Sequence, residues 1–158
     1  MHRRSFVVGL LTLCTTVLMA TRRAAAWELI TNEELEREKS ASAVQSHEAP
    51  ASAAPAQLGA PTIDVEQPDA ARPITSPITI RIRFTPQPGS TIQPGSFRAT
   101  YGWLGIDITS RIIANAKVDA SGIVAENANI PPGQYQVTLQ IADNLHRVGR
   151  RVLNFTVT

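Results

Sequence analysis

The sequence predicts an all-β fold, an antiparallel two-sheet sandwich of seven to eight strands, preceded by a short helix and a disordered tether. Two observations lead to this prediction. Apolar and polar side chains alternate with period two over most of the chain after Pro61, as in strands with one buried face. Turn-forming residues interrupt the alternation at short intervals, and no long helical pattern intervenes. A single open sheet would leave one apolar face in water, so two packed sheets are expected.

Residues 1–26 have the layout of an export signal. A basic start is followed by an apolar run over residues 6–20, and three alanines precede Trp27. Because this run is shorter than the ~20 residues that a membrane-spanning helix needs, we expect cleavage after Ala26 and no stable membrane span afterwards. The expected location is periplasmic or secreted. A retained N-terminal anchor is the alternative.

The start of this signal, from His2 to Val8, resembles the twin-arginine export motif, with Arg3 and Arg4 as the arginine pair. It departs from that motif at His2. The twin-arginine and general secretory routes therefore both stay open.

The composition after the signal excludes several kinds of site. The only cysteine and both methionines are Cys14, Met1 and Met19, so the remaining chain has no disulfide, cysteine nucleophile or soft-metal site. Four of the 15 basic residues also lie in the signal, which leaves slightly more acidic than basic side chains. The basic stripe that nucleic-acid binding requires is missing, so no nucleic-acid partner is expected.

A short helix is expected after the signal. Thr31 and Glu34 have the spacing of a capping box, and Ile30 and Leu35 that of a hydrophobic staple. Too few apolar residues follow for this helix to be stable alone, so it is either frayed or docked on another surface. From Ser40 to Pro61 the chain consists mainly of Ala, Ser, Pro and Gln, which predicts a disordered tether.

The expected domains are a signal peptide at 1–26, the helix and linker at 27–60, and the sandwich at 61–158. The sandwich strands are recognised by apolar residues at alternate positions, in chain order Ile63 and Val65; Ile78, Ile80, Ile82 and Phe84; Phe97, Ala99, Tyr101 and Trp103; Leu104, Ile106 and Ile108; a stretch around 112–118; Ile123 with Val124; Tyr135, Val137, Leu139 and Ile141; Leu153, Phe155 and Val157. Turns are expected at 86–89, 94–95, 119–122, 131–133 and 143–149.

Three segments carry a resemblance to a known family: Pro61–Val65, Pro77–Ile80, and Pro132–Val137 followed by Ala142 and Asp143. The third has the Gly-x-Tyr-x-Val pattern with which such domains enter a late strand, and its Ala142-Asp143 lies where they have an Ala-x-Asp hairpin. In these segments the chain resembles the bacterial immunoglobulin-like domain superfamily. The resemblance implies an immunoglobulin-like fold and a surface or periplasmic context, but no activity.

The connection 143–151 is the first candidate binding surface. It contains His146, Arg147, Arg150 and Arg151 between the last two expected strands. Guanidinium groups bind carboxylates and phosphates, so an anionic glycan, a lipid headgroup or an acidic envelope protein is a conceivable partner. The alternative is a solvated hairpin whose charges keep an edge strand from pairing with other chains.

Three aromatic residues have alternative interpretations. We expect Tyr135 to form a tyrosine corner, with its hydroxyl returning to the backbone of the preceding connection. Tyr101 and Trp103 continue the alternation of Phe97 and Ala99, which are expected to face inward, so both are expected to lie in the core. The alternative is an aromatic surface for a sugar, and it keeps Trp103 among the candidate binding residues. Arg81 and Arg83, on the outward side of a strand, have the same ambiguity as the hairpin arginines.

The sequence predicts no catalytic, cofactor-binding or metal-binding residues. After the signal the only histidines are His47 and His146, and no phosphate loop or serine elbow is present. Asp107 and Asp143 are interpreted as turn acceptors rather than calcium ligands. We expect a non-enzymatic envelope module that docks a partner through a strand edge or the hairpin. The alternatives are a glycan- or anion-binding domain and an accessory domain of an envelope enzyme.

Overall fold

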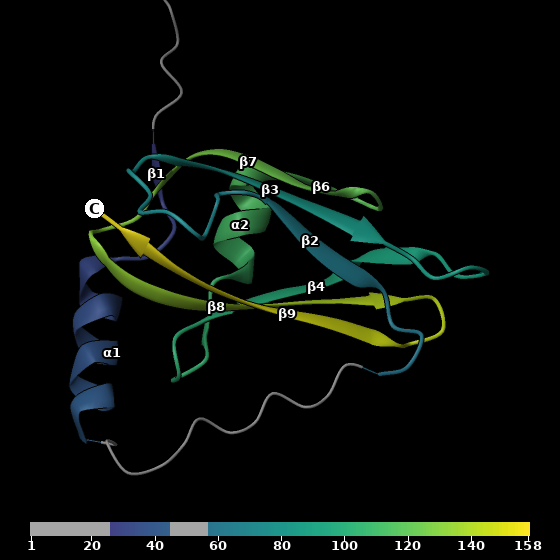
Figure 1. Ribbon diagram of the computed structural model, residues 1–158, viewed down its shortest axis with the longest axis horizontal. Helices are drawn as coiled ribbons and strands as arrows, with labels where there is room; N and C mark the ends of the chain where they lie inside the picture. The colour runs from purple at the N-terminus through teal and green to yellow at the C-terminus, as the bar shows by residue number, and fades with distance from the viewer. Residues whose placement is uncertain (1–25, 45–56) are drawn as a thin grey trace, which may run out of the picture.

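The computed structural model describes residues 26–44 and 57–158 and contains two facing β-sheets (Figure 1). The predicted all-β sandwich is confirmed. Residues 1–25 of the expected signal, which was predicted to span 1–26, and residues 45–56 of the expected tether lie outside the described residues.

The first sheet has five strands. Its order is β1 (Trp27–Glu28), β7 (Gly122–Asn129), β3 (Ile78–Thr85) and β2 (Thr62–Gln67), with β6 (Ala116–Asp119) also paired to β7. β1 and β6 share one edge of β7. β6 is antiparallel to β7 from Gly122 to Ala125, and β1 is parallel to it at Ala128 and Asn129.

The second sheet has four antiparallel strands in the order β5 (Ile106–Asp107), β4 (Ile92–Tyr101), β8 (Gly133–Asp143) and β9 (Val148–Val157). Inward-facing side chains of both sheets form the core, as the alternation predicts. The strand that the sequence did not predict is β1, because two residues are too short for a period to be read.

Two local predictions within the second sheet are wrong. Residues 94–95 lie inside β4 rather than in a turn, and the register of β4 against β8 shifts between Gln93 and Arg98, so these residues form a bulge. Trp103 is 45% exposed rather than buried. Gly102 has φ +67°, a conformation that ends the strand, so the alternation no longer applies to the residue after it.

The sequence predicted a strand around 112–118. The structure instead has the helix α2 (Thr109–Asn115) there, and the strand β6 begins only after it. Ile108 and Ile112 are four residues apart and both are buried, whereas Ile113 is 46% exposed. This is the one-sided burial of a short helix. The adjacent isoleucines did not distinguish a helix from a strand.

The N-terminal helix α1 (Asn32–Val44) is longer than expected. The prediction of a disordered tether is therefore wrong for residues 40–44. It is also wrong for residues 57–61, which contact the hairpin before β2 begins. The capping box is confirmed: the Thr31 N–H donates to Glu34 Oε2 at 3.0 Å, and the Glu34 N–H donates to Thr31 Oγ1 at 3.3 Å. Of the two alternatives for this helix, frayed or docked, the structure has it docked.

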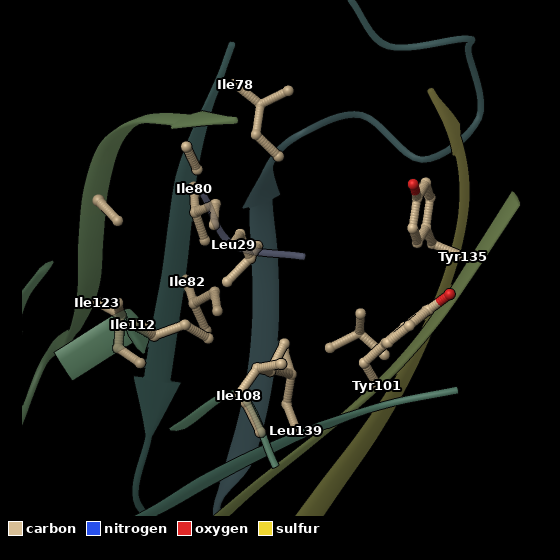
Figure 2. Packing of buried hydrophobic residues seen from close by; sticks show 14 of the residues in the cluster. Leu29, Ile78, Ile80, Ile82, Tyr101, Ile108, Ile112, Ile123, Tyr135 and Leu139 are labelled. Atoms are coloured by element: carbon tan, nitrogen blue, oxygen red, sulfur yellow. The ribbon is translucent and has the colours of Figure 1, made fainter. Parts of the chain in front are cut away.

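Apolar residues of the N-terminal segment belong to the same core as the two sheets. Leu29, Ile30 and Leu35 are all buried, and the Leu29 N–H donates to the Asn129 carbonyl at 3.0 Å. Figure 2 shows Leu29 beside Ile80 between the sheets. The core thus includes residues on the N-terminal side of the expected domain start at residue 61.

Glu34 joins this segment to α2. Arg111 of α2 donates to both carboxylate oxygens of Glu34, each at 2.6 Å, and also to the Leu29 carbonyl at 3.1 Å. The hydrogen bonds from Arg111, together with those from Thr31, outweigh burial and lower the pKa of Glu34 to about 2. A bidentate guanidinium–carboxylate pair of this kind fixes orientation as well as charge.

Tyr135 makes the predicted tyrosine corner. Its hydroxyl donates to the Pro131 carbonyl at 2.6 Å. The neighbouring Tyr101 ring lies 5.5 Å from the Tyr135 ring (Figure 2). The Tyr101 hydroxyl is buried and makes no hydrogen bond of good geometry among the described residues, and burial together with the nearby Glu38 carboxylate raises the pKa of Tyr101.

Replacing Glu34 should reduce the free energy of unfolding at neutral pH and flatten its pH dependence. The pKa of Glu34 is lowered in the folded state, so its contribution is present above about pH 4.5 and is lost as the pH falls towards about 2. We expect Glu34→Gln to cost about 2–3 kcal/mol at pH 7 and much less at pH 2. Urea unfolding at both pH values measures this. Glu36→Gln, on an exposed pair of the same helix, is the control, and an equal effect of both variants would contradict the account.

The two tyrosines should respond in opposite ways to loss of the hydroxyl. Tyr135→Phe removes the hydrogen bond to Pro131 and should cost about 1 kcal/mol. Tyr101→Phe removes a buried hydroxyl without a partner and should leave the protein as stable or more stable. Thermal unfolding of the two variants tests this, and a larger loss for Tyr101→Phe would contradict it.

Candidate functional site

The hairpin between β8 and β9 is organised around Asp143. This side chain is buried, and it accepts hydrogen bonds from the N–H groups of Leu145 and Arg147, both at 2.9 Å. Burial opposes its charged form, yet the hydrogen bonds from Arg147 and from the backbone hold the pKa of Asp143 below its usual value. The prediction that Asp143 is a turn acceptor is confirmed.

Arg147 is held inside the hairpin rather than presented to solvent. Its Nε donates to Asp143 Oδ2 at 2.7 Å, and its Nη2 lies 2.6 Å from the same oxygen. The guanidinium also lies against Gly59, where a Cβ atom would be 2.7 Å from Nη1. Nearby, the Val148 N–H donates to Gln57 Oε1 at 3.1 Å. Arg147 therefore connects the hairpin to the segment that enters β2.

The other candidate residues of the hairpin point in different directions. Arg150 is opposite Gln140 on the outer face of the second sheet, and Arg151 is opposite the buried Leu139 and so belongs to the other face. His146 is exposed at the tip with φ +60°. The hairpin thus does not form one convergent cluster of arginines.

The remaining candidates lie elsewhere. Trp103 lies just after Tyr101, the last residue of β4, which pairs with Val137 near the start of β8. The hairpin follows Asp143, which is at the opposite end of β8. Arg81 and Arg83 belong to the first sheet, and Arg83 pairs with Glu66 at 2.5 Å. The five predicted surface residues are therefore divided between two ends of the second sheet.

One edge of β9 has a short unpaired stretch, which we call the β9 edge: the backbone groups of Arg150, Val152 and Asn154. The Ile74 N–H donates to the Thr156 carbonyl at 2.9 Å, so the backbone groups of Thr156 point away from β8. Because this direction alternates along a strand, the N–H and C=O groups of Arg150, Val152 and Asn154 point away from β8 as well. Ile74 covers one end of this row and Gln57 covers the other. Among the described residues nothing pairs with the row between them.

A polar cleft of about 420 Å³ lies between α1 and the end of β8 and β9 distant from the hairpin. We call it the amide groove, and it is lined by Glu38, Ala70, Gln134, Tyr135, Gln136, Asn154, Phe155 and Thr156. Gln136 Nε2 donates to Asn154 Oδ1 at 3.2 Å across the two strands. This bond leaves the side-chain oxygen of Gln136 and the side-chain amide hydrogens of Asn154 available to a ligand, whereas the backbone carbonyl of Gln136 has a partner of its own.

Trp103 is attached to the amide groove through the backbone. Its N–H donates to Glu38 Oε1 at 3.3 Å, and the Gly102 N–H donates to the Gln136 carbonyl at 2.8 Å. A Cβ atom on Gly102 would lie 2.6 Å from the Glu38 carboxylate, so only glycine permits this contact. The backbone of residues 102 and 103 is therefore held against Glu38 and Gln136, two residues that line the groove.

Part of this groove could have been predicted from the sequence. Gln134, Gln136 and Gln140 are at alternate positions of one strand and therefore share an outward face. The pairing of Gln136 with Asn154 depends on the register of β9, and the position of Glu38 depends on how α1 docks. Neither follows from a local pattern, so sequence reasoning missed both residues.

No protein-family model matches the chain, and no curated protein or solved structure matches it either. Over residues 26–44 and 57–158, no group of three or more His, Cys, Asp and Glu side chains is placed to hold a metal ion. Within the same ranges, no helix has the length and apolar character needed to cross a membrane.

The arginines of the hairpin should separate into one structural residue and two surface residues. Arg147→Gln leaves the buried Asp143 carboxylate without its ion pair and should cost about 2–4 kcal/mol of unfolding free energy. Arg150→Gln and Arg151→Gln should each change it by less than about 0.5 kcal/mol. Chemical denaturation of the three variants checks this, and equal values would show that Asp143 does not depend on Arg147.

Proposed function

We propose that the protein is an exported, non-enzymatic interaction module of the bacterial periplasm or envelope, built on an immunoglobulin-like sandwich. It docks an extended, acidic segment of a partner protein along the β9 edge. The observation that carries the proposal is the row of unpaired backbone groups between two covered ends of β9.

The strand order supports an immunoglobulin-like assignment. If β2 to β9 are lettered A, B, C, C′, D, E, F and G, the sheets are A-B-E-D and C′-C-F-G, the immunoglobulin arrangement. Tyr135, near the start of the strand lettered F, supplies the tyrosine corner at the place typical of that fold. β1 is an addition to this arrangement.

Export is compatible with the described body. Cleavage after Ala26 would make Trp27 the first residue, and Trp27 is also the first residue of β1. The buried residues of the N-terminal segment, from Leu29 onward, would all remain in the mature chain.

Charge favours an acidic partner at the β9 edge. A peptide that adds to this edge would form backbone hydrogen bonds with Arg150, Val152 and Asn154. Arg150 and Arg151 lie on opposite faces of the strand, and neither makes an ion pair with any described residue. Their guanidinium groups can therefore receive acidic side chains at successive positions of the peptide, one on each face.

A second candidate function is glycan binding, which the amide groove favours and the arginines of the hairpin do not. The two surfaces use different chemistry. Edge docking depends on backbone hydrogen bonds and positive charge, whereas the groove offers side-chain amides and one carboxylate.

Selection of random peptides displayed on phage against the full chain tests edge docking. We expect the selected peptides to be rich in alternating acidic and β-branched residues and to bind about tenfold or more weakly to Val152→Pro, which removes an edge N–H. Val152→Ala retains that N–H and is the matched control. Both variants must first unfold cooperatively like the parent chain.

Moderate salt should weaken the selected peptides, because the arginines contribute part of the affinity. Peptides that bind Val152→Pro as tightly as Val152→Ala, or a selection that enriches no acidic sequence, would overturn edge docking.

A further inference from the structure

We propose that the amide groove binds a neutral saccharide, with Trp103 as the platform for one sugar ring. This inference does not rest on the β9 edge, because the groove uses side chains of α1, β8 and β9 and not unpaired backbone groups. It assigns to the chain a second binding site with a different class of ligand.

The charge of the groove selects against anions. Its lining contains one carboxylate, Glu38, and no lysine or arginine. An acidic sugar or a phosphate would meet that carboxylate without a compensating cation, which disfavours binding. A neutral saccharide meets no such repulsion, and its hydroxyls can donate to the carboxylate oxygens.

The amides provide donors and acceptors in a fixed arrangement. The bond between Gln136 and Asn154 holds both side chains in place, so little rotamer entropy is lost when a ligand binds. Gln134 and Thr156, opposite each other in the same register, extend the polar surface by one more pair. Adjacent hydroxyls of a sugar ring require such alternating donors and acceptors.

Trp103 adds the apolar part of the site. Trp103 is 45% exposed on its turn, so a ligand that covers it would gain free energy by removing apolar surface from water. The C–H face of a sugar ring is apolar enough to pack on an aromatic ring, while its hydroxyls point sideways. The backbone contacts of Trp103 with Glu38 and of Gly102 with Gln136 fix this turn to two residues that line the groove, and the proposal has the indole of Trp103 cover a sugar ring bound there.

The experiment titrates the full chain with neutral hexasaccharides of glucose, xylose and N-acetylglucosamine, and with the galacturonic acid hexamer as the charged counterpart. Tryptophan emission and the side-chain amide signals of Gln136 and Asn154 in NMR spectra are the readouts. We expect at least one neutral hexamer to change both, and the galacturonic acid hexamer to change neither.

Single substitutions show which residues cause the changes in emission and which contribute to binding. Trp103→Ala should abolish the emission change, whereas Trp27→Phe should retain it, because Trp27 donates to the Glu126 carbonyl away from the groove. Gln136→Ala should weaken binding about tenfold, the cost of losing one or two hydrogen bonds. Thr138→Ala, on the same outward face of β8 but outside the groove, is the matched control.

Three results would overturn the proposal: no change with any neutral hexamer at millimolar concentration, equal binding by Gln136→Ala and Thr138→Ala, or equal binding of the galacturonic acid hexamer. Val152→Pro separates the two proposals. Saccharide binding that survives this variant depends on the groove, whatever the outcome for peptides at the β9 edge.

Discussion

The pair between Glu34 and Arg111 is the interaction on which the arrangement of this molecule depends. One carboxylate closes the capping box of α1 and also receives two hydrogen bonds from α2. Because Arg111 holds the Leu29 carbonyl as well, the same contact keeps Leu29 and Ile30 in the core. The carboxylate that caps α1 therefore also connects the N-terminal segment to the sandwich.

The two ends of the second sheet are fixed by different contacts. At one end, docking of α1 places Glu38 over Gly102 and creates a wall of the amide groove. At the other end, Asp143 and Arg147 fix the hairpin against the entry to β2. β1 and β6 together occupy one edge of β7, whereas β9 is covered only at its ends. Edges that are left uncovered in a sandwich are available for pairing with another chain.

The sequence predicted those features that depend on local periodicity and turn chemistry. The inward residues of β3 and β8, the capping box, the tyrosine corner and the acceptor role of Asp143 all followed from short patterns. The features it missed depend on distant partners or on a broken period. α2 was taken for a strand because Ile112 and Ile113 are adjacent, Trp103 was placed inside because Gly102 was not recognised as a strand end, and β1 was too short to show a pattern.

Native-state hydrogen exchange of the Leu29 amide tests the central claim most directly. If the N-terminal segment is an integral part of the core, this amide, which donates to the Asn129 carbonyl, should exchange only through global unfolding, with the same protection as the amides in the middle of β8. If the Leu29 amide exchanges through local opening while the β8 amides stay protected, the segment is a loosely attached arm and the account is contradicted.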